Sequence, residues 1–184
     1  MMIETSRFGS ISVSENDIIT FPEGMLGFSK IDQYVLIERG DDSLFMWLQA
    51  LKKPSVAFPL LEPQILEKTY KVEMLEEDLK VLQLKDLKHA KVFSIITIPT
   101  DPSKMTANLK APVVINVKKR LAKQVILHDQ DYPIRKAIFS DLQQYCISTE
   151  RTIFPTDEAS AYQTIAISEQ GFNQSRKSEP EIQS

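Results

Sequence analysis

The stretches VFSIITI at residues 92–98 and VVINV at residues 113–117 decide the fold. Both are short runs rich in β-branched residues, which suit the pleated surface of a sheet. Each lies between a lysine and a proline, which interrupt an apolar pattern. Their lengths are typical of strands and short for helices. We therefore predict that both segments are strands of a buried or half-buried sheet.

Other segments of the first 130 residues carry the same signature. Residues 9–14, GSISVS, alternate serines on one face with Ile11 and Val13 on the other, as in a half-buried strand. Similar β-branched or aromatic runs occupy residues 34–37, 45–48, 56–61 and 121–127. The fold class that we expect is mainly β: an antiparallel, barrel-like domain with one or two short helices.

Two segments favour helices instead. In residues 75–82 leucines fall at helical spacing, and acids crowd the first turn, where the helix dipole favours negative charge. A second helix is expected from Pro133 onward, because apolar residues recur there at helical spacing and proline suits a first helical turn. The apolar residues of this second segment are Ile134, Ala137, Ile138, Leu142 and Tyr145.

Size and charge limit the function classes. With 184 residues, of which 42% are hydrophobic, the chain is long enough for a domain with its own core. The formal net charge of -3 argues against non-specific affinity for nucleic acid or anionic membrane. Residues 101–140 nevertheless hold 8 bases and 3 acids. This basic middle is either one electropositive face or is neutralised by acidic elements folded against it.

The chain also carries signs of its compartment. Glu4 stands where a secretory signal would carry basic residues, and no apolar segment follows it. The single cysteine, Cys146, excludes an intramolecular disulfide and a cysteine-ligated zinc site, and its apolar neighbours indicate a buried, inert thiol. We expect a cytoplasmic protein without a membrane-spanning segment.

Motifs for catalysis are missing from the sequence. The two histidines, His89 and His128, do not form an H-x-x-x-H pair, and no G-x-S-x-G, P-loop or G-x-G-x-x-G pattern occurs. We therefore expect no catalytic residue, no metal site and no cofactor, and predict that the protein is not an enzyme.

Some residues are unusual for a domain that only folds. FPEG at residues 21–24 fits a type I turn, and the loop continues with Met25, Leu26 and Phe28 although loops usually carry polar side chains. Trp47 lies in a run that is either core or the rim of a binding face. The acids of residues 76–78 either complement a helix dipole or form a docking patch for a basic partner.

Five pieces of the sequence resemble the FliW family of flagellar assembly factors, in order over roughly residues 3–136. They are FG-I at residues 8–11, ITFPEG--GF at 19–28, WLQ at 47–49, MTANLKAPVVIN at 105–116 and QVIL at 124–127. The resemblance implies a non-enzymatic regulator that binds CsrA, a dimeric RNA-binding repressor of flagellin translation, and thereby relieves repression. It also implies that newly made flagellin binds as a competing partner. We expect a monomer with no direct contact to nucleic acid or membrane.

Candidate partner-binding residues follow from the loop, the aromatic run, the acidic run and the NLKAP segment, because exposed apolar groups on turns suit recognition. They are Phe21, Pro22, Met25, Leu26, Phe28, Trp47, Gln49, Glu76, Glu77, Asp78, Asn108, Leu109, Lys110, Pro112 and Asn116. The glycines, prolines and asparagines of these segments have an alternative, purely structural role.

Two other functions remain open on the sequence. The basic segment 110–136 could serve an RNA-binding module, and a barrel with a pocket near Trp47 could bind a small ligand. For domain organisation we expect a FliW-like β domain at residues 1–140 and an extension atypical of the family at 141–167, with apolar content enough to pack. Residues 168–184 are too polar to bury a core and are expected to form a disordered tail.

Overall fold

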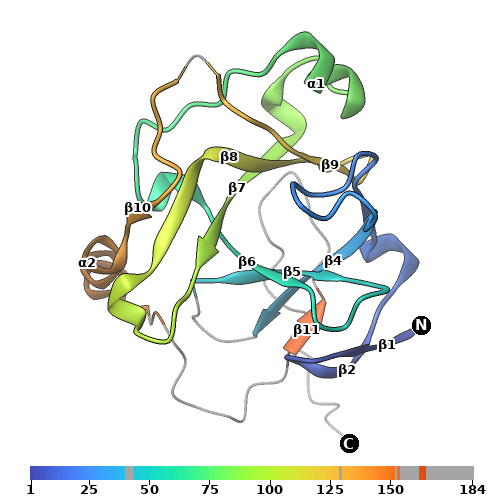
Figure 1. Cartoon of the computed structure of the whole chain (residues 1–184), viewed down its shortest axis with the longest axis horizontal. Coiled ribbons are helices and arrows are strands. Elements are labelled where there is room, and N and C mark those ends of the chain that lie inside the picture. Colours follow the sequence, from blue (N-terminus) through green and yellow to red (C-terminus); the bar gives the residue numbers. More distant parts are fainter. Residues whose placement is uncertain (40–43, 129, 152, 154–161, 165–184) are drawn as a thin grey trace, which may run out of the picture.

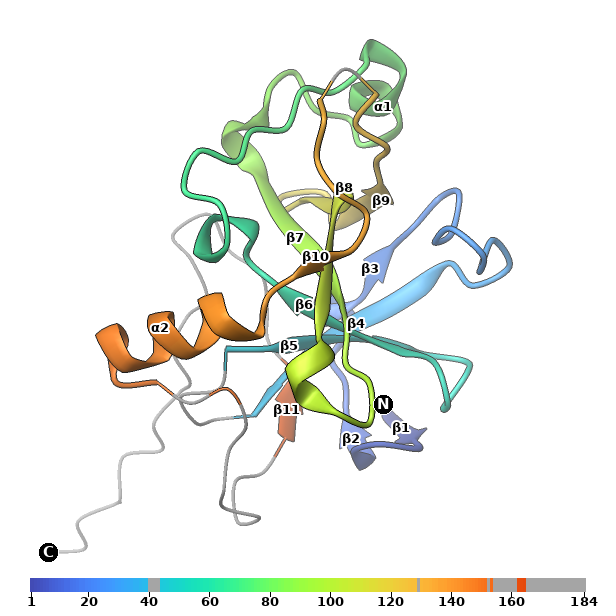
Figure 2. The same ribbon diagram turned by 60° about the vertical axis from the view of Figure 1, so that its left-hand side comes forward.

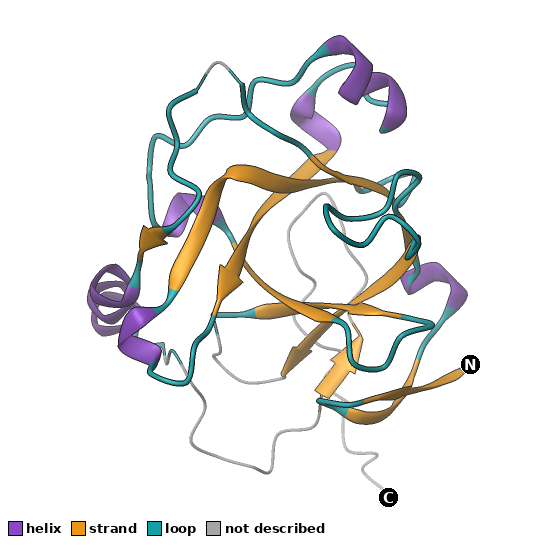
Figure 3. Cartoon of the chain, in the orientation of Figure 1, coloured by secondary structure: helices purple, strands orange, loops and turns teal. Residues whose placement is uncertain are grey.

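Seven strands close into a β-barrel (Figures 1 and 3). The computed structural model describes residues 1–39, 44–128, 130–151, 153 and 162–164. The barrel strands are β3 (Ile19–Thr20), β4 (Gln33–Arg39), β5 (Met46–Ala50), β6 (Ala57–Leu61), β7 (Ala90–Thr97), β8 (Thr106–Asn116) and β9 (Leu121–Gln124). Neighbouring strands pair in the order β8-β7-β6-β5-β4-β3-β9, and β9 returns to β8 to close the ring. The predicted mainly β, barrel-like fold is confirmed.

One pairing departs from the expected antiparallel pattern. β3 and β9 run parallel, with Thr20 opposite Leu121, whereas the other barrel pairs are antiparallel. The barrel therefore closes through a two-residue strand, which is supported by the hydrogen bond from the Thr20 N–H to the Arg120 carbonyl at 2.8 Å.

The remaining elements cover the ends and sides of the barrel (Figure 2). They are the hairpin of β1 (Met2–Thr5) with β2 (Gly9–Ser12), helix α1 (Glu76–Val81), helix α2 (Phe139–Thr149), and β10 (Lys136–Ala137) and β11 (Tyr162–Thr164), which pair with β8 and β4. Single 3-10 turns lie at Glu15–Asp17, Pro63–Ile65, Leu87–His89 and Pro102–Lys104. In β2 the predicted alternation holds, because Ile11 is buried between two exposed serines.

Strand β8 contains a bulge, which is formed by the NLKAP segment at residues 108–112. Asn108 pairs with Ile95 and Val113 pairs with Phe93, so that residues 109–112 lie opposite the single residue Ser94. The side-chain oxygen of Asn108 accepts the backbone N–H groups of residues 110 and 111 at 3.1 and 3.0 Å. This side chain therefore replaces the ladder hydrogen bonds that the bulge interrupts.

The carbonyl groups of the bulge are bound by other segments. The Tyr70 hydroxyl donates to Leu109 O at 2.7 Å, and the N–H groups of Leu127 and Val125 donate to the carbonyls of residues 110 and 112, both at 2.9 Å. The chain after β9 is thus attached along the bulge. Satisfied backbone groups let the bulge be buried, so this segment has a structural function.

The second helix begins later than predicted. Residues 136–137 pair with residues 106–107 of β8, and the N–H of Ile138 donates to Met105 O at 3.2 Å. Sheet pairing uses the backbone groups that a helix from Pro133 would need, so α2 starts at Phe139 and Ile134 is exposed. The prediction of a helix over residues 75–82 is confirmed by α1.

Helix α2 packs on the side of the barrel through Leu142 and Cys146, against a buried cluster that includes Leu61, Ile96 and Met105. Burial raises the pKa of the Cys146 thiol above its ordinary value, as expected for an inert cysteine. Part of the predicted extension at 141–167 and the whole predicted tail at 168–184 lie outside the described residues.

Candidate partner-binding groove

A groove of about 370 Å³ lies between the loop of residues 21–29, the chain around the end of β9 and the start of helix α1. Its lining residues are Glu23, Gly24, Met25, Leu26, Gly27, Ser29, Leu75, Glu77, Asp78, Lys123, Gln124, Ile126 and His128. Two of the predicted candidate segments, the loop and the acidic run, therefore meet on one surface although they lie far apart in the sequence.

The loop holds its shape through two tight turns. Gly24 N–H donates to Phe21 O at 3.0 Å, which confirms the predicted turn, and Phe28 N–H donates to Met25 O at 2.8 Å. The side chains of Phe21 and Met25 are buried in the barrel core and anchor the loop. Leu26, inside the second turn, points outward, since 53% of its surface is exposed.

Gln124 attaches the loop to the barrel wall. Its side-chain oxygen accepts the Leu26 N–H at 3.2 Å, and its amide nitrogen donates to Ala111 O at 3.2 Å. One buried amide therefore joins the loop, β9 and the β8 bulge. The position of Leu26 in the groove is fixed by the fold.

Three large apolar side chains are exposed along the groove. Leu26, Leu75 and Ile126 have 53%, 42% and 42% of their surface exposed and come from the loop, the residue before α1 and the chain after β9. Single exposed apolar residues are common, but three around one groove form the kind of patch that marks an interface.

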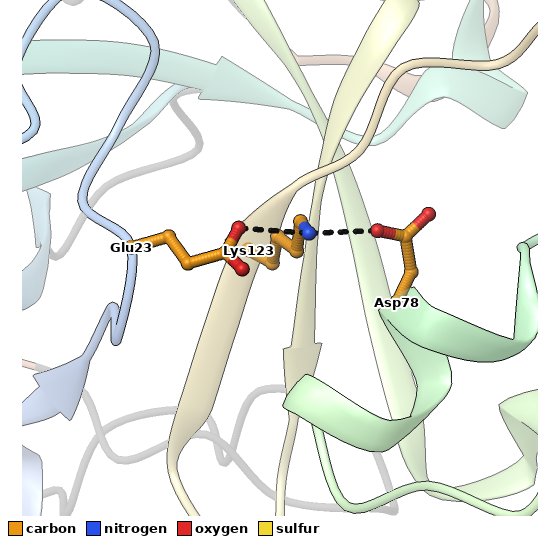
Figure 4. Close-up of polar contacts among 3 residues, drawn as sticks. All are labelled: Glu23, Asp78 and Lys123. Carbon is orange, nitrogen blue, oxygen red and sulfur yellow. Dashed lines mark ion pairs between the residues drawn. The ribbon is translucent and has the colours of Figure 1, made fainter.

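A lysine joins the two walls of the groove (Figure 4). Lys123 Nζ lies 2.8 Å from Glu23 Oε2 and 2.8 Å from Asp78 Oδ1, with the two carboxylates on opposite sides of it. Burial alone would lower the pKa of Lys123, but the hydrogen bonds to Asp78 and Glu23 outweigh it and raise the pKa above its ordinary value. The ammonium is therefore charged and held between two carboxylates.

The acidic run divides into an internal and an external part. Asp78 is buried and bound to Lys123, so it is not the exposed docking residue that the sequence suggested. Glu77 is exposed at the groove, and Glu76 is exposed next to it and pairs with Lys80 at 3.3 Å. Of the three acids in this run, only Glu76 and Glu77 can therefore contact a partner directly.

Several other predicted candidates are buried and shape the fold. Phe21, Met25, Gln49, Leu109, Pro112 and Asn116 are buried, so their side chains are not available on the surface for a partner. The Gln49 amide donates to Ala50 O at the end of β5, at 2.9 Å, and to the carbonyls of Lys53 and Pro54 in the turn that follows. Asn116 donates to Leu82 O at 2.8 Å and accepts the N–H groups of residues 118 and 119, both at 3.1 Å. Both amides satisfy turn backbone, which is the structural alternative.

The remaining candidates lie away from the groove lining or beside it. Trp47 is half-buried under the β1–β2 hairpin, with the Arg7 guanidinium 4.2 Å above its ring and Phe8 edge-on at 5.6 Å. Phe28 packs edge-on against Phe58 at 5.2 Å. Pro22 is exposed, Asn108 holds the bulge, and the Lys110 ammonium donates to Gln130 O.

Several groove residues are absent from the sequence-based candidates, among them Glu23, Leu75, Lys123 and Ile126. Glu23 lies inside the FPEG turn and Lys123 interrupts a strand pattern, which was the only local signal for either residue. Their importance depends on contacts between segments that local periodicity does not connect.

Among the described residues, no three His, Cys, Asp or Glu side chains are grouped to hold a metal ion. None of the helices in the same part of the chain is long and apolar enough to cross a membrane.

Comparison with known proteins identifies the family. The family model described as FliW protein matches residues 2–138, which is most of the chain and ends where α2 begins. The chain belongs to the FliW family. Its FliW-type sequence therefore includes the barrel, the loop 21–29, α1 and β10, and thus the whole groove.

Curated FliW proteins and a solved FliW structure agree with this assignment. The flagellar assembly factor FliW of Bdellovibrio bacteriovorus is 46% identical over 144 residues, which cover 78% of this chain and 82% of the relative. That of Ruminiclostridium cellulolyticum is 39% identical and is covered to 98%. A crystal structure of FliW superposes with a TM-score of 0.71 at 35% identity, over 76% of this chain and 97% of the FliW chain. The chain is a flagellar assembly factor of this family.

Proposed function

We propose that this FliW-family chain is a non-enzymatic regulator in the cytoplasm that binds two proteins in competition. One partner is a CsrA-type RNA-binding repressor of flagellin translation, whose capture relieves repression. The other is newly made flagellin, which occupies the factor while secretion is slow and so returns the repressor to the message. Exchange between the two partners couples synthesis to assembly.

The observation that carries this proposal is the groove on a FliW-type barrel. Its exposed side chains include the apolar Leu26, Leu75 and Ile126, the acidic Glu23 and Glu77, and the polar Ser29 and His128, a mixture that suits protein recognition. The similarity to FliW proteins extends over nearly their full lengths, so the family role of a flagellar assembly factor applies to the complete FliW-type unit.

The placement of the basic side chains supports a protein partner over direct RNA binding. In the segment 110–136, Lys123 is bound by Glu23 and Asp78, and Lys136 lies 3.5 Å from Asp141. Acidic elements folded against this segment therefore neutralise part of its charge, which was one of the two alternatives for the basic middle.

Purified components test the proposal. Titration of this protein into a complex of CsrA-type repressor and labelled flagellin message should release the RNA, and added flagellin should restore the repressor–RNA complex. The protein alone should bind neither message nor unrelated RNA. If the protein bound neither the repressor nor flagellin, the proposal would be contradicted.

A further inference from the structure

We infer that the groove between loop 21–29, β9 and α1 is the docking site of the RNA-binding repressor, and that it receives a segment with a Lys or Arg beside a large apolar side chain. This inference rests on the proposed function and assigns one of its two partners to one surface. Figure 4 shows three charged residues of this groove: Glu23 on the loop, Lys123 on β9 and Asp78 on α1.

The apolar part of the occupant follows from the exposed apolar side chains of the groove. Leu26, Leu75 and Ile126 come from three separate segments, so the groove offers an inserted aliphatic or aromatic side chain apolar surface from each of them. Central apolar anchors surrounded by polar groups carry most of the binding energy of protein interfaces.

The basic part follows from the charges. The lining holds the carboxylates of Glu23, Glu77 and Asp78 against the single ammonium of Lys123. Lys123 is already engaged on both sides, and Glu77 has no ion-pair partner among the described residues. The Glu23 side chain is 53% exposed and uses only one oxygen on Lys123, so it can accept a further hydrogen bond. The groove therefore favours a cation.

The choice between the two proposed partners rests on charge complementarity. Proteins that bind RNA carry basic surfaces, because phosphate neutralisation supplies much of their affinity. A groove whose lining is mainly acidic attracts such a surface and speeds association with it. The lining carries three carboxylates against one ammonium and so favours a basic segment over an acidic one, which is why we assign the groove to the repressor and not to flagellin.

The groove is also held in shape before a partner arrives. Lys123 joins the loop to α1, and Gln124 joins Leu26 to the barrel wall. A preformed groove spares the partner the cost of ordering a loop, which strengthens binding. Lys123 is thus a positioning residue for Glu23, not a contact for the partner.

Binding of the repressor and of flagellin to matched variants tests the inference. The groove variants are Leu26→Ser, Ile126→Ser and Glu77→Lys. The controls are Ile147→Ser and Glu15→Lys, two exposed positions outside the groove lining. Ile147 lies on α2, on the other side of the barrel from the loop (Figure 2). Isothermal titration gives each dissociation constant, and thermal unfolding verifies that each variant is folded.

Each groove variant should weaken repressor binding at least about tenfold, and the loss in Glu77→Lys should shrink at high salt. Flagellin binding and both controls should stay close to wild type. Wild-type repressor affinity in the folded groove variants would overturn the docking site while the proposed function stands. Loss of flagellin binding alone, or of both partners in a folded variant, would overturn the assignment to the repressor. If the wild-type protein binds neither partner, the proposed function itself fails.

Discussion

Lys123 Nζ lies 2.8 Å from Asp78 Oδ1, and this contact joins strand β9 to helix α1. Both side chains are largely withdrawn from water, with 18% and 9% of their surfaces exposed. A charge pair in such a place is costly to break, because the remaining partner keeps its charge without compensation. Glu23 on the same ammonium extends the connection to the loop.

Replacing Lys123 by Met should therefore destabilise the protein. We expect a loss of about 2 kcal/mol in the free energy of unfolding, less than the roughly 3–5 kcal/mol of a fully buried pair because the groove admits water. Urea unfolding, monitored by circular dichroism, measures this loss of stability. Adding Asp78→Asn to Lys123→Met should recover part of the loss, since the uncompensated charge is removed. Equal stability of Lys123→Met and wild type would contradict a structural role for the pair.

Stability should fall steeply on the alkaline side. Hydrogen bonds to Asp78 and Glu23 outweigh burial and raise the pKa of Lys123, while burial, with a smaller effect of Asp32, raises the pKa of Tyr34 to about 12. Because the folded state holds both protons more tightly, this stability is complete below pH ~10 and is lost as pH rises through the folded pKa values. Urea unfolding at pH 8, 10 and 11.5 should show the decline, and Tyr34→Phe should reduce its slope. A free energy of unfolding that stayed constant up to pH 11.5 would contradict this prediction.

The strands with the strongest β-branched runs could be predicted, because burial on a sheet dictates their composition. β4 and β7 formed where the patterns indicated, but the two-residue strands β3 and β10 left no pattern of their own. Their pairing is decided by partners elsewhere in the chain. For the same reason residues 133–137, whose apolar spacing suggests a helix, instead run along β8.

The candidate site could be predicted only in part. The sequence marked the loop and the acidic run as unusual, and the structure brings both to one groove. It did not indicate that Met25 turns inward while Leu26 turns outward, because tight turns and core packing decide this. Nor did the sequence indicate that Asp78 is buried whereas Glu77 is exposed. Asp78 is bound by Lys123, which lies far along the chain.

Two buried tyrosines should respond in opposite directions to loss of their hydroxyl groups. The Tyr34 hydroxyl has no hydrogen-bond partner among the described residues, so Tyr34→Phe should stabilise the protein by about 1 kcal/mol. The Tyr70 hydroxyl donates to Leu109 O at 2.7 Å in the β8 bulge, so Tyr70→Phe should cost about 1–2 kcal/mol. Differential scanning calorimetry should give melting temperatures shifted by a few degrees in opposite directions. Shifts of the same sign would contradict this difference.

The two glycines of the groove loop should differ in their tolerance of alanine. Both have left-handed backbones, with φ of 68° at Gly24 and 82° at Gly27, so either substitution incurs roughly 1–2 kcal/mol of strain. At Gly27 an added Cβ meets no atom within 4 Å, so the backbone strain should be the whole cost of the substitution. At Gly24 it would lie 2.6 Å from Ser29 Cα and 2.8 Å from Phe28 O, which are backbone atoms that cannot rotate away.

Gly24→Ala must therefore displace the turn that carries Glu23 and Leu26, and we expect it to cost about 3 kcal/mol or more in the free energy of unfolding. It should also weaken repressor binding, since the groove loses its loop wall, whereas Gly27→Ala should keep most of the affinity. Urea unfolding and titration calorimetry on the two variants measure both effects. Equal costs for the two substitutions would mean that the loop relaxes around Gly24, and the groove would then not be preformed.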